Sequence, residues 1–406
     1  MSDQPAPSSK HAQRSLGSNQ VGMREYNERV LLQAIRLHGS LPKAELARLS
    51  RLSTQTVSVI VDRLLEEGLV ERRDAQRGKV GQPSRPIALR ADAAFSIGVR
   101  LGRRSLDVLV LDFAGRARWR AGTDYPTPRV DEVFADIAVQ LGRIADFLGE
   151  GAGRLAGIGL AAPLMFGGWQ ELLGMAARDA DAWTRVDMRE RLQALTPLPV
   201  EFAKDTAAAC VAELVAGRGR ALENYLYVFI DVLAGGGLVI DSQPHGGRFG
   251  NAGALGSMPL GLAGAGRPRQ LLDAASLVVL EKAFAAAGLP ALAAADDRVL
   301  DAPWADVTRA WIGRAADAIA FAVCNAACVL DLDGVIVDGA MGRGLLAALL
   351  DEVGVALGRY DWQGTMRPQV VAGEIGADAK VWGAACLPLH SGFAPAHDLF
   401  LKSARG

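Results

Sequence analysis

Hydroxyl and amide side chains crowd one short segment of this 406-residue chain, residues 53–65. Within it, Val57, Ile60, Val61 and Leu64 follow the i, i+3, i+4, i+7 spacing that gives a helix one buried face. The polar side chains between them are of the kinds that hydrogen-bond to the base edges and phosphates of a DNA duplex. We therefore predict that DNA is contacted by Ser53, Thr54, Gln55, Thr56, Ser58 and Arg63.

The residues before this segment are expected to form two further helices that hold it in place. A first helix is predicted over residues 23–37. A second begins near Pro42, with Ser40 as its N-cap. The third helix, which contains the polar segment, would run over residues 53–67 and end at Gly68, because glycine commonly ends a helix.

Two short strands follow, at residues 69–73 and 87–89, and they flank a loop rich in Gly, Arg and Pro at residues 74–86. Three helices and a two-stranded wing predict a winged helix-turn-helix over residues 21–90, whose third helix enters the major groove. A helical protein-interaction domain with a basic loop is the alternative. From the wing we predict contacts to the DNA backbone or minor groove by Arg77, Lys79, Gln82 and Arg85.

The charge distribution agrees with a nucleic-acid surface confined to the front of the chain. Residues 1–90 carry 15 Lys and Arg against 9 Asp and Glu, whereas the remainder carries 29 against 36. Chance clustering is the competing explanation. Residues 1–20 hold few large apolar side chains and are expected to be a disordered tail. No apolar run reaches the roughly 18 residues of a membrane span, so we expect a cytoplasmic protein.

The four cysteines, Cys210, Cys324, Cys328 and Cys386, are too scattered to form a disulfide framework. Cys324 and Cys328 lie four residues apart in an Ala-rich segment. We expect both to be small buried core residues, with a metal-binding pair as the less favoured alternative. No cofactor is expected.

Behind residue 94 the pattern changes to apolar strands alternating with helices. Strands are predicted at residues 95–101, 106–112 and 155–162, with a helix at residues 130–148. The same order returns from residue 225 onward, which indicates two related α/β halves around a ligand-binding cleft. We place the first half at residues 94–203, with the C-terminal helix as a candidate to complete it, and the second at residues 204–406.

The order of several motifs resembles the ROK family (repressors, open reading frames and sugar kinases), and its transcriptional regulators in particular. The motifs are Lys43-Ala-Glu-Leu-Ala-Arg-Leu-Ser, Gly81-Gln-Pro-Ser-Arg-Pro86, Gly157-Ile-Gly-Leu-Ala-Ala-Pro163, Phe202-Ala-Lys-Asp205, Gly250-Asn-Ala-Gly-Ala-Leu-Gly256 and Asp331-Leu-Asp-Gly-Val-Ile-Val-Asp-Gly-Ala340. The resemblance implies an actin-like ATPase fold of the sugar-kinase type for the body. It also implies one of two activities. Either the protein phosphorylates a sugar, or it binds a sugar or sugar phosphate and this binding changes its affinity for operator DNA.

Two departures from the family's kinase motifs argue against phosphoryl transfer. The first phosphate loop of the kinases, of type Asp-x-Gly-x-Thr, reads Arg100-Leu-Gly-Arg-Arg104 here. The second, of type Gly-Thr-Gly-x-Gly, reads Asp231-Val-Leu233-Ala-Gly. A carboxylate there would repel phosphate, and the branched side chain of Leu233 would block close approach of the backbone. We therefore expect a protein that is not an enzyme.

The resemblance also identifies candidate effector contacts. Asp205 stands at the family's catalytic aspartate and could accept hydrogen bonds from sugar hydroxyls, or it could simply cap the helix that follows. The family's Glu-x-Gly-His reads Ala254-Leu-Gly-Ser257, and no cysteine follows where the family has a zinc loop, so no metal is expected. The predicted effector-binding residues are Asp205, Asn251, Ser257 and Asp273.

Together these features predict a DNA-binding repressor of carbohydrate-metabolism genes, controlled by a sugar or sugar-phosphate effector. The expected partners are operator DNA and a second copy of the chain, as a homodimer or homotetramer. One alternative is a sugar kinase that retains a DNA-binding head. Another is a regulator whose body no longer binds sugar.

Overall fold

The computed structural model describes residues 20–74, 85–166, 170, 175–262, 266–290 and 296–395. The chain divides into two compact units. One, called here the winged-helix unit, contains the residues up to Ala93 together with those from His390 onward. The other, called the body, spans Ala94–Leu389. The predicted tail at residues 1–20 lies almost entirely outside the described residues.

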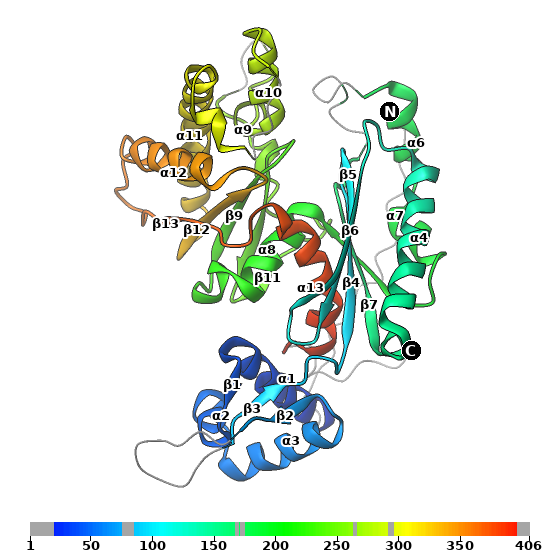
Figure 1. Ribbon diagram of the computed structural model, residues 1–406. Helices are drawn as coiled ribbons and strands as arrows, with labels where there is room; N and C mark the ends of the chain where they lie inside the picture. The colour runs from blue at the N-terminus through cyan, green and yellow to red at the C-terminus, as the bar shows by residue number, and fades with distance from the viewer. Residues whose placement is uncertain are drawn as a thin grey trace. The chain divides into compact units, whose positions relative to one another are not determined.

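The winged-helix unit contains the three predicted helices and a small antiparallel sheet with strand order β1-β3-β2 (Figure 1). Its elements are α1 (Gln20–His38), β1 (Ser40–Leu41), α2 (Lys43–Ser50), α3 (Thr54–Glu66), β2 (Val70–Arg72) and β3 (Ile87–Leu89). The predicted winged helix-turn-helix is therefore confirmed as a fold, with one additional short strand.

Helix α3 forms where the sequence predicts it. Its N-cap residue and its apolar spacing both place the helix over the same residues. Ser53 Oγ accepts a hydrogen bond from the Thr56 backbone N–H at 3.1 Å, which satisfies one of the free donors at the helix start. The predicted apolar residues Val57, Ile60, Val61 and Leu64 are all buried. Burying each such side chain contributes about 1.5–3 kcal/mol, which fixes the face that α3 turns outward.

The prediction that Ser40 caps α2 is wrong. Ser40 lies in β1, opposite Ala88 of β3, and α2 begins three residues later at Lys43. Pro42 occupies the cap position and makes no side-chain cap bond. Pairing with the wing competes for the backbone groups of residues 40 and 41, so the chain is still extended where a capped helix was expected.

The body contains two five-stranded sheets with the same topology. The first has the order β6-β5-β4-β7-β8, in which β6, β5 and β4 are antiparallel and β4, β7 and β8 are parallel. Its strands are β4 (Phe95–Leu101), β5 (Ser105–Asp112), β6 (Ala117–Asp124), β7 (Leu155–Ala162) and β8 (Val200–Lys204).

The second sheet repeats this arrangement with the order β11-β10-β9-β12-β13. Its strands are β9 (Tyr225–Ile230), β10 (Gly235–Ile240), β11 (Gln243–Pro244), β12 (Gly334–Gly339) and β13 (Gln369–Ala372). An antiparallel hairpin followed by parallel strands thus occurs twice, which confirms the two related α/β halves.

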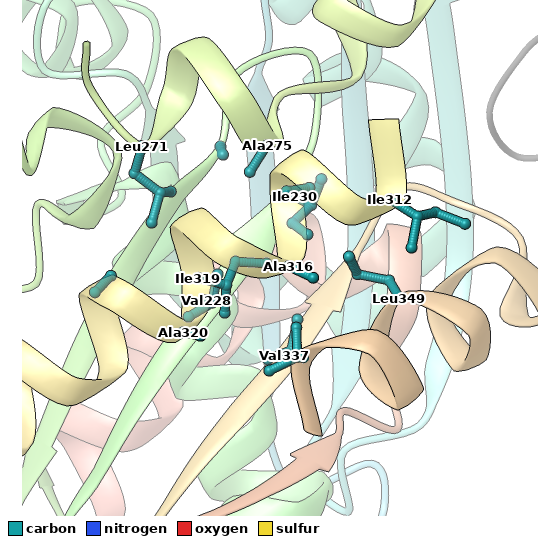
Figure 2. Close-up of a cluster of buried hydrophobic side chains, with 14 of the residues drawn as sticks. Val228, Ile230, Leu271, Ala275, Ile312, Ala316, Ile319, Ala320, Val337 and Leu349 are labelled. Carbon is teal, nitrogen blue, oxygen red and sulfur yellow. The ribbon is translucent and has the colours of Figure 1, made fainter. Parts of the chain in front are cut away.

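The outer faces of the two sheets are covered by separate sets of helices (Figure 1). On the first sheet, α4 (Val130–Leu148) packs with α6 (Ala177–Thr184) and α7 (Met188–Gln193) around one apolar core. On the second, the helices are α9 (Leu272–Ala275), α10 (Leu277–Ala286), α11 (Ala305–Ala327) and α12 (Arg343–Leu357). Figure 2 shows Val228 and Val337 of this second sheet meeting Ile319 and Ala316 of α11.

Two helices, α8 (Asp205–Ala216) and α13 (Ala379–Phe393), pack on the opposite faces, where they contact both sheets. They cross closely, because a Cβ at Gly383 of α13 would collide with the Ala208 carbonyl of α8. A Cβ at Gly159 of β7 would likewise collide with the Ala384 carbonyl. Small residues therefore bring the first turns of α8 and α13 together between the two halves.

The paired cysteines do not behave as core residues, so that expectation is wrong. Cys324 is only half-buried and Cys328 is exposed, because the end of α11 reaches the surface, whereas Cys210 and Cys386 are buried. Among the residues whose positions are described, no three His, Cys, Asp or Glu side chains form a group that could hold a metal ion. None of the helices described is both long and apolar enough to span a bilayer.

Candidate functional site

Two places in the molecule gather functional side chains: the outward face of α3 and a cavity in the body. On α3, Ser53, Thr54 and Gln55 are exposed, while Thr56 and Ser58 are half-buried. Thr56 Oγ1 lies 2.8 Å from Ser53 Oγ, so these two hydroxyls also serve the helix cap. Gln55 has the greatest freedom to reach a base edge, since its amide extends from the first turn of the helix.

Arg63 does not extend freely from this face. Its guanidinium lies 2.9 Å from Glu28 of α1 and 2.9 Å from Glu67 just after α3. Its charge is therefore matched within the winged-helix unit. A phosphate contact would have to compete with both carboxylates, which makes Arg63 the weakest of the predicted contacts on α3.

Val59 is a candidate contact that the sequence reasoning missed. Its side chain is 66 % exposed and lies one turn after Gln55 on the same face. The missed signal was the i, i+4 spacing from Gln55, because only polar residues were considered on the outer face. Branched apolar side chains can contact the C5-methyl group of thymine in the major groove.

The second half of α3 has a different charge. Asp62 and Glu66 are exposed there, and Asp62 accepts hydrogen bonds from Lys43 at 2.9 Å and from Arg72 at 3.4 Å. These carboxylates would be repelled by DNA phosphates, whereas the first half of α3 is neutral and polar. The first two turns are therefore the part of α3 suited to a DNA groove.

Of the wing contacts predicted from the sequence, only Arg85 can be placed. It is exposed and precedes Pro86 and β3. Arg77, Lys79 and Gln82 lie outside the described residues.

The second site is a cavity of about 100 Å³ in the body, at the place where the two halves meet. The β4–β5 turn, the end of β7, the β8–α8 junction and the β9–β10 turn all reach it. The lining residues are Arg103, Pro163, Leu164, Met165, Lys204, Asp205, Thr206, Leu233, Ala234, Gly235, Asn251, Ala254, Gly256, Ser257 and Leu272.

Three of the four predicted effector-binding residues, Asp205, Asn251 and Ser257, line this cavity. The fourth, Asp273, does not. One of its carboxylate oxygens accepts a hydrogen bond from the Gln270 backbone N–H at 2.8 Å, so the side chain stabilises the turn before α9. The sequence could not separate these cases, because an aspartate that caps a turn and one that lines a pocket have the same local pattern.

Asp205 is buried and held by a residue that lies far away in the sequence. Lys380, in the first turn of α13, donates to Asp205 Oδ2 at 2.6 Å. Asp205 is the first residue of α8, and its Oδ1 accepts from the Thr206 backbone N–H at 2.9 Å. The carboxylate therefore stabilises the helix start, as the capping alternative proposed, and also forms a buried ion pair.

The same lysine also reaches the β9–β10 turn. Lys380 Nζ lies 2.8 Å from Asp231, and the Arg100 guanidinium donates to the same Asp231 carboxylate at 3.1 Å. Arg100 also donates to Asp107 of β5 at 2.8 Å. Arg100 of β4 and Asp231, directly after β9, thus form a salt bridge between the two halves of the body. We call these five residues, Asp107, Arg100, Asp231, Lys380 and Asp205, the ion network.

The electrostatics of the ion network hold the carboxylates of Asp205 and Asp231 in the charged form. Burial alone would raise the pKa of Asp231, but Lys380 and Arg100 together hold that pKa well below its ordinary value. Burial is likewise outweighed at Asp205, where Lys380 lowers the pKa of the carboxyl. A carboxylate with a lowered pKa is a poorer general base than an unperturbed one.

Lys380, Arg103 and Lys204 are the main residues of this site that the sequence reasoning missed. Lys380 is 175 residues from Asp205 along the chain, so no local pattern could connect them. Arg103 and Lys204 lie within motifs that the resemblance did identify, at positions to which it gave no role. The one signal in the sequence was a lysine near the start of an Ala- and Gly-rich apolar segment, and it pointed to no partner.

Comparison with known proteins finds a family for each of the two units. The family model of the ROK family matches residues 96–390, and a model of the MarR family matches residues 26–79. The xylose repressor of Bacillus subtilis is 23 % identical over 251 residues, covering 60 % of this chain and 62 % of the relative. The transcriptional dual regulator NagC of Escherichia coli is 24 % identical over 257 residues, with the same two coverages. The match thus spans about three-fifths of the length of these curated relatives.

Solved structures share the fold. A ROK family transcriptional regulator described as a homolog of the E. coli Mlc protein superposes with a TM-score of 0.67 at 18 % identity, covering 92 % of this chain and 98 % of that one. A ROK family glucokinase from Streptomyces griseus, in complex with glucose and AMPPNP, gives a TM-score of 0.58 at 20 % identity and covers 72 % of this chain and 99 % of that one. The body thus has the actin-like ATPase fold of sugar kinases, and the chain belongs to the ROK family.

Proposed function

We propose that this protein is a DNA-binding transcriptional regulator, a repressor of carbohydrate-metabolism genes, whose body binds a sugar effector and does not phosphorylate it. The observation that carries the proposal is the combination of an exposed polar α3 with a kinase-like cavity whose two phosphate loops are joined by the Arg100–Asp231 salt bridge. The sugar would bind next to Asp205, Asn251 and Ser257, which line the cavity.

The DNA-binding part of the proposal is supported by exposure and charge. The first two turns of α3 present Ser53, Thr54 and Gln55 at the surface, and α3 is the recognition helix of this fold. The MarR family match covers the same helices, and the relatives named above are described as a repressor and a transcriptional regulator. Base contacts would come from Gln55 and its neighbours, and phosphate or minor-groove contacts from Arg85 and the rest of the wing.

The absence of kinase activity is proposed from the ion network. Phosphoryl transfer needs a base beside the sugar hydroxyl and donors around the phosphates. Here Lys380 neutralises Asp205 and keeps its pKa low, and the Asp231 carboxylate stands in a loop that would face nucleotide phosphates in a kinase. Arg100 is already bonded to two carboxylates. Nucleotide binding would therefore require several buried ion pairs to break first.

Helix α13 offers a covalent route from the cavity to the winged-helix unit. Its first turn carries Lys380, which bonds Asp205 in the body. Its last turn belongs to the winged-helix unit, where Arg29 of α1 donates to the carbonyls of Ser391 at 3.1 Å and of Ala394 at 3.3 Å. We propose that a sugar beside Asp205 acts on DNA affinity through this helix. Tens-fold coupling would require about 2 kcal/mol of differential binding.

We further propose that two or four copies of the chain bind a roughly palindromic operator. Recognition helices of this type read half-sites about one helical turn apart, so a two-fold dimer matches a two-fold site. Light scattering on the purified chain, alone and on DNA, measures the assembly.

The decisive experiment starts by selecting bound sequences from random duplex DNA with the full chain. Binding to the selected duplex is then measured by fluorescence anisotropy against a panel of sugars, with Arg29→Ala as the coupling variant. We expect one sugar to weaken DNA binding at least tenfold in the wild type. In Arg29→Ala, DNA binding should survive while the response to the sugar shrinks.

A parallel assay addresses the enzyme alternative. The chain is incubated with ATP, Mg²⁺ and the same sugars, and ADP release is followed; no turnover above a protein-free blank is expected. Turnover that disappears in Asp205→Asn would reject the regulator-only proposal in favour of a kinase with a DNA-binding head. Sequence-specific DNA binding that no sugar alters would instead favour a regulator whose body has lost its ligand.

A further inference from the structure

We propose that the body contains a second small-molecule site, which binds an organic acid with an apolar body, such as an aromatic or medium-chain carboxylate. This site is a cavity of about 330 Å³, called here the apolar cavity. It adjoins the cavity of about 100 Å³ in which a sugar is proposed to bind, called here the sugar cavity, because Leu164 and Lys204 line both. The inference goes beyond the proposed function, since the apolar cavity has a lining of its own and its ligand is not a sugar.

The apolar cavity lies against one face of α8. Ala207, Cys210 and Val211 follow the i, i+3, i+4 spacing of a single helix face, and all three line the cavity. Further apolar lining comes from Leu238 of β10 and from Leu387 of α13. Because the side chain of Ala207 is only a methyl group, space remains between α8 and these elements.

The size and polarity of the apolar cavity are those of a small-molecule site. Such sites typically enclose about 300–1,000 Å³ and combine a mostly apolar lining with a few polar groups. Among the described residues that line this cavity, Lys204 and His245 have basic side chains, and the others are apolar residues, glycines and Cys210. Burial raises the pKa of the Cys210 thiol to about 12, so this residue stays neutral and behaves as a small apolar side chain.

The lining of the apolar cavity also leaves large apolar side chains exposed to solvent. Phe249 is 77 % exposed and Leu164 is 36 % exposed, although both line the cavity. The guanidinium carbon of Arg248 lies 5.5 Å from the ring centre of Phe249, and most of the ring stays uncovered. A ligand with an apolar body would remove this surface from water, which favours its binding.

Lys204 supplies the charge that selects an acid. Its side chain is half-buried, and burial lowers the pKa of its amino group. Within the described part of the chain, no acceptor lies at hydrogen-bonding or ion-pair distance from Lys204 Nζ, and the neighbouring carboxylate of Asp205 is bonded to Lys380 instead. The charges of Asp205 and Lys380 act on the Lys204 amino group in opposite directions, so they partly offset each other. A partly buried cation without a partner is unfavourable, and a bound anion would supply that partner.

The lining as a whole therefore specifies an amphipathic acid. Lys204 can donate hydrogen bonds to a carboxylate, and the exposed imidazole of His245 carries a further donor. A neutral apolar molecule would leave Lys204 unpaired, and a sugar would place hydroxyl groups against apolar side chains. A phosphate ester of the same apolar group shares the anionic chemistry, and the experiment separates the two. Because Leu387 and Lys380 lie on the same helix, the bound acid would contact α13.

The test uses pairs of compounds that share an apolar body and differ in charge: benzoate with benzamide, phenylacetate with phenylacetamide, and octanoate with octanamide, together with phenyl phosphate. Thermal unfolding of the full chain is followed with each compound, and Kd is measured by calorimetry for those that raise Tm. We expect at least one carboxylate to raise Tm where its amide does not. Lys204→Met, which keeps an apolar stem, should weaken that carboxylate about 10- to 100-fold, as expected for loss of a charge-assisted hydrogen bond.

Filling the apolar cavity provides a test that does not depend on charge. Ala207→Leu should weaken the same carboxylate about tenfold or more, because the larger side chain takes up space that the ligand needs. Ala286→Leu and Lys282→Met, at exposed residues of α10 outside the lining, should leave its Kd unchanged. In the ligand-free protein, Lys204→Met should keep or raise Tm, because it removes an unpaired and partly buried charge. A large fall in Tm for that variant would mean that Lys204 serves the fold and not a ligand, and would overturn the inference.

The remaining outcomes concern the apolar cavity and leave the proposed function standing. An amide that raises Tm as much as its acid would overturn the role of Lys204. Binding of phenyl phosphate and of no carboxylate would overturn the assignment of a carboxylate as the charged group. A carboxylate that is weakened by Ser257→Ala but not by Ala207→Leu would occupy the sugar cavity, and the second site would be rejected. If no compound of the panel raises Tm, the inference fails, while DNA binding and its response to sugars are measured independently.

Discussion

Helix α3 and the ion network both contain polar side chains, but those of α3 are exposed and those of the ion network bond to one another. At the start of α3, Ser53, Thr54 and Gln55 lie at the surface, where they are exposed to an external partner. Beneath the cavity, Lys380, Asp205 and Asp231 are buried and bond to one another. Surface polar groups contribute little to stability and are available for recognition, whereas buried charges contribute to the fold only as a complete set.

Among the substitutions that test this difference, one at Lys380 is expected to have the largest effect on stability. Lys380→Met leaves two buried carboxylates without their shared cation, and we expect the body to lose about 3–5 kcal/mol in free energy of unfolding. Chemical denaturation measures the loss. Lys282→Met, at an exposed lysine, should change stability by less than about 0.5 kcal/mol.

The loss of unfolding free energy in Lys380→Met is expected to become smaller as the pH falls. The pKa values of Asp205 and Asp231 are lowered in the folded state from an ordinary value of 3.8. Their contribution is therefore present above that pH and is lost as pH falls through the lowered folded-state values. The gap between wild type and Lys380→Met should narrow in acid. A gap that stays constant between pH 7 and pH 3 would contradict the assignment of the loss to these carboxylates.

On the surface side, the largest effect is expected at Gln55. Gln55→Ala should reduce discrimination at one base pair of the selected duplex by about 1–3 kcal/mol, because a bidentate amide contact to adenine is lost. Competition binding against single-base variants measures it. Glu66→Ala lies on the same helix in its acidic half and serves as the control; it should leave discrimination unchanged. Equal behaviour of the two variants would remove Gln55 from the base-reading surface.

Val59 should have a smaller and chemically distinct effect. If its exposed side chain contacts a thymine methyl group, Val59→Ala weakens binding by about 1 kcal/mol, as expected for lost apolar contact. Replacing thymine by uracil in the site should weaken wild-type binding by a similar amount. Additive losses from the protein and DNA changes would show that Val59 does not contact that methyl group.

Arg85 is expected to contribute to DNA affinity irrespective of the base sequence of the duplex. Arg85→Ala should weaken binding to specific and unrelated duplexes alike and reduce the slope of log K against log salt by about one unit. Titrations at several salt concentrations measure the slope. Arg309→Ala, an exposed arginine of α11 in the body, is the matched control. An unchanged slope in Arg85→Ala would place the residue outside the DNA interface.

The smallest predicted effect concerns His390, a half-buried ionisable residue of the winged-helix unit. Burial, assisted by Arg36, lowers the pKa of His390 to about 4. The unfolded chain takes up a proton near the ordinary value of 6.5 while the folded chain does not, so stability falls as pH decreases from about 6.5 toward 4. His390→Gln should flatten this dependence in denaturation curves. An unaltered pH profile would assign the dependence to other groups.

Much of the fold could be predicted because its signals are local. The apolar spacing of α3, the strand β4 at Phe95–Leu101 and the helix α4 at Val130–Leu148 all follow from residues within one element. The error at Ser40 has the opposite origin. Its capping pattern is local and valid, but the pairing of β1 with β3 overrides it. In that pairing Ser40 lies opposite Ala88, which is 48 residues later in the chain.

The candidate site shows the same difference between residues with a local sequence signal and residues whose contacts depend on packing. Asp205, Asn251 and Ser257 were predicted because each stands in a motif of a few residues, and all three line the cavity. Asp273 was predicted from the same kind of local signal, but its side chain accepts a hydrogen bond within a turn and does not line the cavity. Arg63 has a plausible position on α3, yet Glu28 of α1 takes up its charge, which only the packing of α1 against α3 decides.

Most helices and strands, the repetition of the strand pattern and the separation of the polar face of α3 from its apolar face can all be predicted from the sequence. These properties depend on periodicity and on the side chains of near neighbours. Which charged side chains form pairs depends instead on how distant elements pack together. Lys380 reaches Asp205 and Asp231 because Gly383 and Gly159 allow α13 to pack closely between the two halves, and the energy of such a buried ion pair depends on distance in space and not on separation along the chain.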